Sequence, residues 1–179
     1  MPTRTAHRGL TLVEFTLVLA VAALLLGLAA PPFNAMVERQ RTVAASNRIV
    51  AHLNRARLHA VHRREIAIVC PSDDGQRCSA GNRWDAGWIV FRDPDRDGQP
   101  GAPADVLQVA PPIVRLHADS AGRTRVRYRP DGTAGGTNLT IKLCPAHPDA
   151  PPRAVIVSNP GRPRVDDLPD HLACPDPGG

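Results

Sequence analysis

The stretch HRGLTLVEFTLVLAVAALLLGLAA, residues 7–30, decides the predicted fold, because it is apolar over about 20 residues and yet carries a carboxylate, Glu14. A helix from Leu10 to Ala30 would be about 30 Å long, which matches the hydrocarbon core of a bilayer. Arg4 and Arg8 precede it, as basic residues precede a signal peptide or a membrane anchor. A charge in lipid is costly, and neither a signal peptide nor a plain anchor explains why Glu14 is there.

Two prolines, Pro31 and Pro32, follow this stretch and predict that the helix ends there, because proline lacks the backbone N–H and its ring clashes with the preceding turn. Beyond them a helical period resumes, and its predicted apolar face consists of Ile49, Val50, Leu53, Ala56, Ala60 and Val61. We expect the opposite, basic face to be solvated, with contact to DNA or anionic lipid as the functional alternative. That face carries Arg41, Arg48, His52, Arg55 and His59.

From Glu65 onward, short runs rich in β-branched and aromatic residues alternate with proline and glycine turns. The expected strands are EIAIVC (65–70), GWIVFRD (87–93), DVLQVA (105–110), TRVRYR (124–129), TNLTIKLC (137–144) and RAVIVS (153–158). Several short strands after one long N-terminal helix, with a transmembrane half and an amphipathic half on either side of the prolines, predict an α+β fold in which antiparallel sheet packs on the helix. The stretch after Pro145 is expected to be irregular apart from 153–158.

The string RGLTLVE, residues 8–14, resembles the class III signal of type IV pilins and type II secretion pseudopilins. The resemblance implies a leader peptide over residues 1–9, which a prepilin peptidase cuts between Gly9 and Leu10 before methylating the new N-terminus. Glu14 would then neutralise the amine of Leu10 on a neighbouring subunit during assembly. Such a pair satisfies both charges in lipid only when the subunits are in register.

The rest of the chain resembles the GspH/FimT type of minor pilin, whose features occur here in the same order. They are LNRARLHAVHRREIAIVC (53–70), Trp84, GWIVF (87–91), Asp93 to Gly98 and GRPR (161–164). The resemblance implies a transmembrane assembly helix over 10–30 and a soluble periplasmic or extracellular domain over 31–179. The subunit would sit in the inner membrane by a single pass before assembly and then in the periplasm or a cell-surface pilus.

Four cysteines, Cys70, Cys78, Cys144 and Cys174, all lie beyond the apolar segment. If that segment exports the domain, an even count predicts two disulfides. Of the three possible pairings we favour Cys70 with Cys78, which closes the loop CPSDDGQRC, and Cys144 with Cys174, which ties down the tail. A zinc site would need clustered thiolates at C-x-x-C-like spacing, and we expect neither a metal nor a cofactor.

The run RTRVRYR places four arginines on one face of a strand, about 7 Å apart, a spacing close to that of phosphates along an extended nucleic-acid strand. We call these residues the arginine strip: Arg123, Arg125, Arg127 and Arg129. The alternative is a solvated sheet face, or an edge strand that charge protects against aggregation.

SNPGRPRVDD, residues 158–167, is the strongest candidate for a binding site. A proline–glycine turn would expose Arg162 and Arg164, and Pro163 would stiffen the backbone between them, so little entropy is lost on binding phosphate. The segment resembles the GRxR motif of FimT-type pilins, which is linked to DNA binding during natural transformation. The alternative is that both arginines merely pair with the two aspartates that follow.

Other motifs favour structural roles. DPDRDG, residues 93–98, has the D-x-D-x-D-G spacing of a calcium loop, but the twelfth position is Ala104, and we expect a turn. Trp84 and Trp88 are expected in the core. We find no nucleophile and base at a recognisable spacing and expect no catalytic activity.

We therefore expect a minor type IV pilin that binds DNA without sequence specificity for uptake in natural transformation and takes part in pilus assembly. Its expected partners are DNA, other pilin subunits, the prepilin peptidase and the inner membrane. The formal net charge of +5 would fall to +3 on removal of residues 1–9, which is too small to predict nucleic-acid binding by itself. The alternatives are a GspH-like minor pseudopilin of a type II secretion system and a minor pilin needed only for pilus initiation and twitching.

Overall fold

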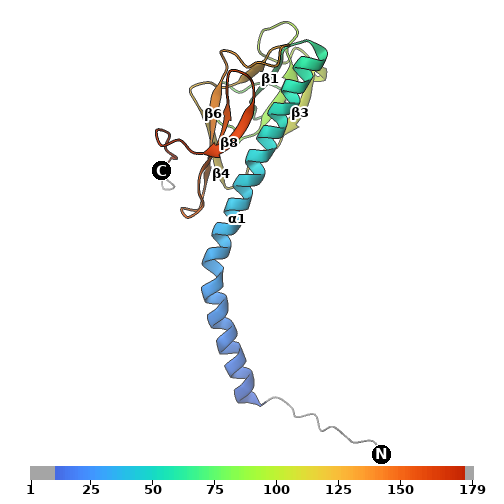
Figure 1. Ribbon diagram of the computed structural model, residues 1–179. Helices are drawn as coiled ribbons and strands as arrows, with labels where there is room; N and C mark the ends of the chain where they lie inside the picture. Colours follow the sequence, from blue (N-terminus) through green and yellow to red (C-terminus); the bar gives the residue numbers. More distant parts are fainter. Residues whose placement is uncertain (1–10, 176–179) are drawn as a thin grey trace, which may run out of the picture.

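A computed structural model describes residues 11–175, without the side chains of 28–32 (Figure 1). The predicted cleavage site between Gly9 and Leu10 lies outside the described residues. The chain starts with one helix, α1 (Leu12–Arg63), of 52 residues. Thr11 caps its N-terminus, and Arg64, in the left-handed conformation, ends it.

Helix α1 runs through Pro31 and Pro32, so the predicted break at these residues is wrong. Each proline removes one backbone donor, but the turns on both sides keep their own hydrogen bonds, and the result is a bend. Figure 1 shows the axis changing direction between the N-terminal half and the half that packs on the sheets. Within the described part of the chain, no helical segment combines the length and the apolarity needed to traverse a bilayer.

Two four-stranded antiparallel sheets pack on the C-terminal half of α1, which confirms the predicted α+β fold. The first sheet has the order β3-β2-β1-β5 and contains β1 (Ala67–Pro71), β2 (Trp88–Arg92), β3 (Val106–Ala110) and β5 (Val126–Tyr128), with a 3-10 turn (Pro103–Asp105) before β3. The second has the order β4-β6-β7-β8 and contains β4 (Leu116–Ala121), β6 (Leu139–Pro145), β7 (Arg153–Val157) and β8 (Pro163–Asp167).

Strands β4 and β8 were not expected from the sequence. In β4 buried residues alternate with more exposed ones such as His117 and Asp119. The run contains few large apolar residues, so its sequence did not predict a strand. Strand β8 begins with Pro163 and carries charges, which an edge strand tolerates because its outer side needs no ladder partner. Cross-strand pairing with β7 orders it, with Val155 opposite Val165.

The core lies between the helix and both sheets, as the helical period predicts. Ile49, Leu53, Ala56 and Ala60 are fully buried, whereas Val61 is 46% exposed. Burial of large aromatic side chains contributes much of the stabilisation. Trp84 and Trp88 are both fully buried, which confirms their predicted place in the core.

Both favoured disulfides form in the structure. Cys70–Cys78 joins the end of β1 to the loop that follows, and Cys144–Cys174 joins β6 to the C-terminal tail. In the chain-entropy picture, the longer connection restricts the unfolded chain more, so Cys144–Cys174, with a sequence separation of 30, contributes more than the eight-residue pair.

Candidate nucleic-acid interface

The GRPR segment (Gly161–Arg164) begins in a turn that the loop after β5 holds in place. Gly161 has φ of +78°, and its N–H donates to the Ser158 carbonyl at 2.8 Å. A side chain at Gly161 would overlap the carbonyl oxygen of Gly132, so the two backbones touch. The N–H of Ala134 also donates to the Asn159 carbonyl at 2.9 Å. These backbone contacts therefore fix the position of the turn from which the exposed Arg162 extends.

Arg162 and Arg164 are both exposed but differ in their surroundings. Arg162 has no carboxylate within ion-pair distance among the described residues, whereas Arg164 Nε lies 3.4 Å from Asp166 Oδ2. Asp167 pairs elsewhere, with Arg153 at 2.9 Å. Arg164 lies in β8 opposite Ile156, so the expectation that both arginines lie on one turn is wrong for Arg164. Exposed pairs of this kind are weak, so Arg164 remains available to an anion.

The arginine strip does not form as one free face. Strand β5 covers only Val126–Tyr128, so Arg123 and Arg125 lie before the strand and Arg129 lies after it. Arg125 and Arg127 are half-buried and point to the loop of DPDRDG: Arg125 Nη1 donates to the Gly98 carbonyl at 2.7 Å, and Arg127 Nη2 lies 4.0 Å from Asp93 Oδ2. The two central arginines therefore hold a loop, and only Arg123 and Arg129 are exposed.

The DPDRDG loop gathers carboxylates around a buried one. Asp93, Asp95 and Asp97 each place an oxygen within 4.8 Å of the others, a spacing that a cation would fit, although the guanidinium of Arg127 already stands beside them. Asp93 is 1% exposed, and its Oδ1 accepts the Gly98 N–H at 3.2 Å. Burial raises the pKa of Asp93, against the opposing effects of the Gly98 N–H and Arg127.

This raised pKa predicts a pH dependence. The folded state holds the proton of Asp93 more tightly than the unfolded state, so its contribution to the free energy of unfolding falls as pH rises from about 4 through the folded pKa. Asp93→Asn keeps the acceptor for the Gly98 N–H and removes the titration. Urea unfolding between pH 4 and 7 should show wild type losing stability relative to the variant as pH rises. Parallel curves would contradict the assignment.

The basic face of α1 is used largely for packing. Trp88 Nε1 donates to His52 Nδ1 at 3.0 Å, and the Arg48 guanidinium lies 5.0 Å from the centre of the Trp88 ring. Burial, and then the charges of Arg48 and Arg55, lower the pKa of His52, so its ring is neutral at pH 7 and accepts this hydrogen bond. Arg41 pairs with Glu38 at 2.6 Å. Of the five predicted residues of this face, His59 pairs with Glu65, and Arg55 alone has no described partner.

Glu14 is exposed on the first turn of α1. Its N–H donates to Thr11 Oγ1 at 3.2 Å, and its Oε2 lies 3.4 Å from the Thr11 N–H, which makes a capping box. Its carboxylate is therefore close to the start of the helix, while the globular domain is at the other end (Figure 1).

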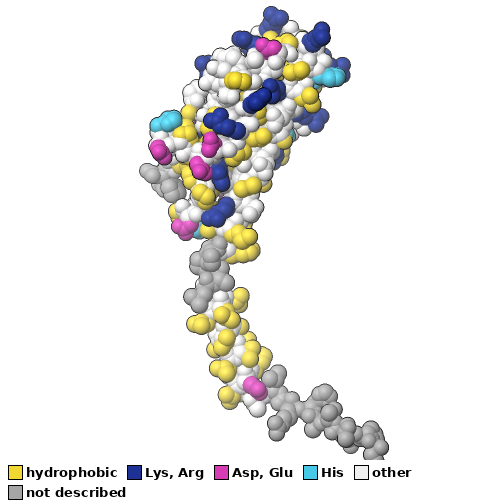
Figure 2. Space-filling model, in the orientation of Figure 1, with side chains coloured by type: hydrophobic (Ala, Val, Ile, Leu, Met, Phe, Trp, Pro, Cys, Tyr) yellow, Lys and Arg dark blue, Asp and Glu magenta, His cyan; other side chains and the backbone are white. Residues whose placement is uncertain are grey.

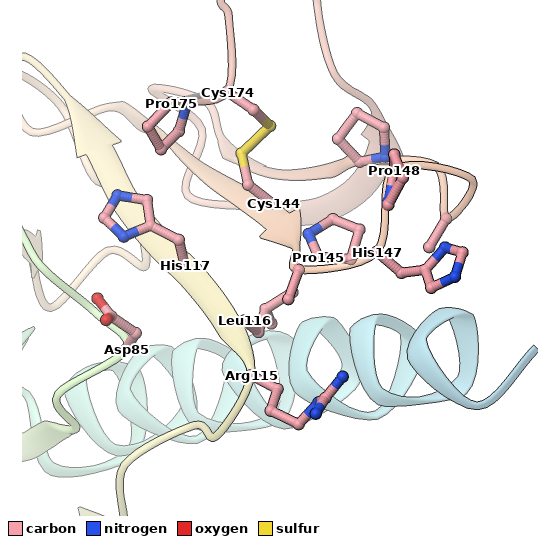
Figure 3. Close-up of a pocket in the computed structure, with 13 residues that line it drawn as sticks. Asp85, Arg115, Leu116, His117, Cys144, Pro145, His147, Pro148, Cys174 and Pro175 are labelled. Atoms are coloured by element: carbon pink, nitrogen blue, oxygen red, sulfur yellow. A yellow bond between two sulfur atoms is a disulfide. The ribbon is translucent and has the colours of Figure 1, made fainter. Parts of the chain in front are cut away.

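A cavity of about 470 Å³ opens between β4 and the proline-rich C-terminal loops (Figure 3). The Cys144–Cys174 disulfide and Pro145 form part of its wall. Its polar residues are engaged: Arg115 Nε lies 2.8 Å from Glu38 and His117 Nε2 lies 2.9 Å from Asp119. The described lining therefore offers no unpaired base beside a nucleophile.

The structure also gathers arginines that the sequence analysis did not single out, namely Arg57, Arg63, Arg64 and Arg96. They come from the end of α1 and from the loop after β2, so no single window of sequence contains them. The only local signal was the basic string HRR at residues 62–64.

Comparisons with known proteins agree on the fold. A profile of the family described as type II transport protein GspH matches residues 45–161. The structure is similar to two crystal forms of the type IV minor pilin FimU of Pseudomonas aeruginosa, with a TM-score of 0.57 at 21% identity in one and 0.52 at 22% in the other. These matches cover 78% and 73% of this chain and 96% and 95% of FimU. No curated protein sequence matches the chain significantly.

Proposed function

The chain belongs to the GspH family, and we propose that within this family it serves as a minor type IV pilin that captures DNA. The observation that carries the DNA-binding role is the GRPR segment, where a turn fixed by backbone contacts presents Arg162 with no carboxylate partner among the described residues. A guanidinium held in this way binds phosphate at a low entropic cost. Binding would be largely independent of base sequence.

Assembly with other pilin subunits follows from family membership, and the N-terminal half of α1 supplies the surface we assign to it. Its large apolar side chains are exposed and extend beyond the globular domain; among them are Leu12, Val13, Phe15, Leu17, Val18, Leu24 and Leu26. An apolar surface of this size requires a covering of lipid or protein. We propose that residues 10–30 lie in the inner membrane after cleavage behind Gly9 and then pack in the fibre, in a role of assembly and binding instead of catalysis.

A DNA-binding measurement tests the proposal. The protein from residue 33 onward contains every buried residue of the described core, the first being Glu38. We expect it to shift duplex DNA at low salt. Arg162→Ala with Arg164→Ala should weaken binding about tenfold or more on every DNA sequence and reduce the slope of log affinity against log salt by about 2, because two phosphate contacts are lost.

The matched control is Arg39→Ala with Arg77→Ala, which removes two exposed arginines that lack a described carboxylate partner outside the GRPR segment. This variant should bind DNA as tightly as wild type to within about twofold. Equal loss in both variants would show that net charge alone drives binding. A wild-type domain that fails to bind DNA at low salt would refute the function.

The second candidate is a minor pseudopilin of a type II secretion system, which binds protein instead of DNA. The family description favours it, and the family match ends at residue 161, just before Arg162 and Arg164. Deletion of the gene would then abolish secretion of a folded exoprotein and leave DNA uptake unchanged. The reverse result supports the first candidate.

A further inference from the structure

The surface around the C-terminal end of α1 is rich in arginine. In Figure 1 this end consists of the last turns of α1 and the loops beside them, and in Figure 2 most of the charged side chains visible in the same region are Lys or Arg. We call the arginines of this end the distal cluster: Arg55, Arg57, Arg63, Arg64, Arg96 and Arg129. Arg57 is half-buried and the other five are exposed.

The distal cluster makes no ion pair within the described part of the chain, although the exposed Asp95 and Asp97 flank Arg96 in sequence. None of its six guanidinium groups has a carboxylate oxygen within 4.0 Å, whereas Arg92 nearby pairs with Asp105 at 2.8 Å. Arg64, Arg96 and Arg129 line an open groove of about 570 Å³ between the helix end and the two loops. Arg64 and Arg96 have φ of 57° and 65°, so the backbone adopts an uncommon conformation at both positions.

The carboxylates of the groove have other partners or are buried. Glu65 Oε1 lies 2.7 Å from His59 Nε2. Asp131 Oδ1 accepts the N–H and the hydroxyl of Thr133, which lowers the pKa of Asp131. Asp93 is 1% exposed. Asp131 reduces the positive potential on its own side of the groove, and the exposed Asp95 and Asp97 reduce it on the loop that carries Arg96. The larger excess of positive charge is therefore at the helix end, where Arg64 lines the groove and Arg63 precedes it.

The cluster is continuous with the GRPR segment. Arg57 Nε donates to the carbonyl oxygen of Gly132 at 2.9 Å, and Gly161 packs against that same oxygen. Arg129 Nη1 lies 3.5 Å from the position that a Cβ atom at Gly135 would occupy, so the Arg129 side chain packs against the loop after β5. One carbonyl group therefore separates Arg57 from the turn that presents Arg162, so the two basic regions adjoin at this point.

We propose that the distal cluster is the main contact surface for the phosphate backbone of DNA, with Arg162 and Arg164 at its edge. This inference rests on the proposed function. Guanidinium groups distributed over a surface wider than one groove match a chain of phosphates better than a single small anion. Backbone phosphates carry no base identity, which agrees with sequence-independent capture.

Fluorescence anisotropy with a labelled duplex and the full chain in neutral detergent tests the proposal. Arg63→Gln with Arg96→Gln removes two exposed charges that make no described side-chain hydrogen bond, so the fold should be retained. The affinity should fall about tenfold or more at low salt, and the slope of log affinity against log salt should shrink by about 2. Arg63→Lys with Arg96→Lys should recover most of the affinity, because the charge contributes most of the effect.

The control is Arg39→Gln, on the same helix about 35 Å before Arg63, which should leave affinity within about twofold, whereas Arg63→Gln alone should weaken it severalfold. If wild type binds and loses affinity only in the Arg162 and Arg164 variant, the proposed function stands and the distal cluster is refuted. If wild type does not bind DNA at all, both fail. Unchanged thermal unfolding of Arg63→Gln with Arg96→Gln excludes loss of fold as the cause.

Discussion

Replacement of Gly161 by valine is expected to destabilise the domain by about 3 kcal/mol and to lower its melting temperature by about 10 °C. Gly161 has φ of +78°, which a β-branched residue adopts only with strain. Its new Cβ would also overlap the Gly132 carbonyl oxygen and lie 3.2 Å from Tyr128 Cε1. The turn must move away from the loop after β5, and Arg162 moves with it. DNA affinity should therefore fall together with stability.

The matched control separates strain from contact. Gly122 has φ of +83°, and a Cβ there would meet no atom within 4 Å. Gly122→Val should therefore cost about 1 kcal/mol, and the difference between the two variants measures the contact between Gly161 and Gly132. Thermal unfolding followed by circular dichroism gives both values. Equal losses would show that Gly161 is needed only for its backbone angle.

Removal of the charge on Glu14 is expected to block incorporation into the fibre without affecting the domain. Its described contacts are confined to Thr11, so Glu14→Gln should leave the melting temperature unchanged. In the assembled fibre the carboxylate is predicted to face the amine of Leu10 on a neighbour. Breaking a buried charge pair costs about 3–5 kcal/mol, which corresponds to a loss of about 100-fold or more in incorporation.

The control for this variant is Thr11→Val, which removes the oxygen that accepts the Glu14 N–H and keeps the carboxylate. It should cost the helix about 1 kcal/mol and reduce incorporation much less than Glu14→Gln. The measurement is the fraction of subunit in sheared fibres against the fraction in membranes. Wild-type incorporation of Glu14→Gln would show that the carboxylate serves only as a helix cap.

Local sequence was sufficient to predict six of the eight strands. Six runs dominated by β-branched and aromatic residues became β1, β2, β3, β5, β6 and β7, because such residues favour a half-buried pleated surface. Strand β8 was missed because Pro163 and two aspartates disfavour a strand locally, and pairing with β7 outweighs that preference. The helix through Pro31 and Pro32 was missed for a related reason: regular helix on both sides outweighs two lost donors.

The sequence by itself determined the class of the molecule: the RGLTLVE string, the helical period after residue 45 and the strand runs are local patterns, and each can be interpreted without knowing its neighbours in space. The sequence left three cysteine pairings open, and the favoured one is the pairing that the structure shows. Where the arginines act was decided only by the tertiary structure. Alternation along RTRVRYR predicted one free strip, but Arg125 and Arg127 point to Gly98 and Asp93, while Arg57, Arg96 and Arg129, distant in sequence, meet at one end. Local pattern determines which face a side chain is on, whereas the partners on that face, and hence the charge left free, depend on contacts between residues far apart in the chain.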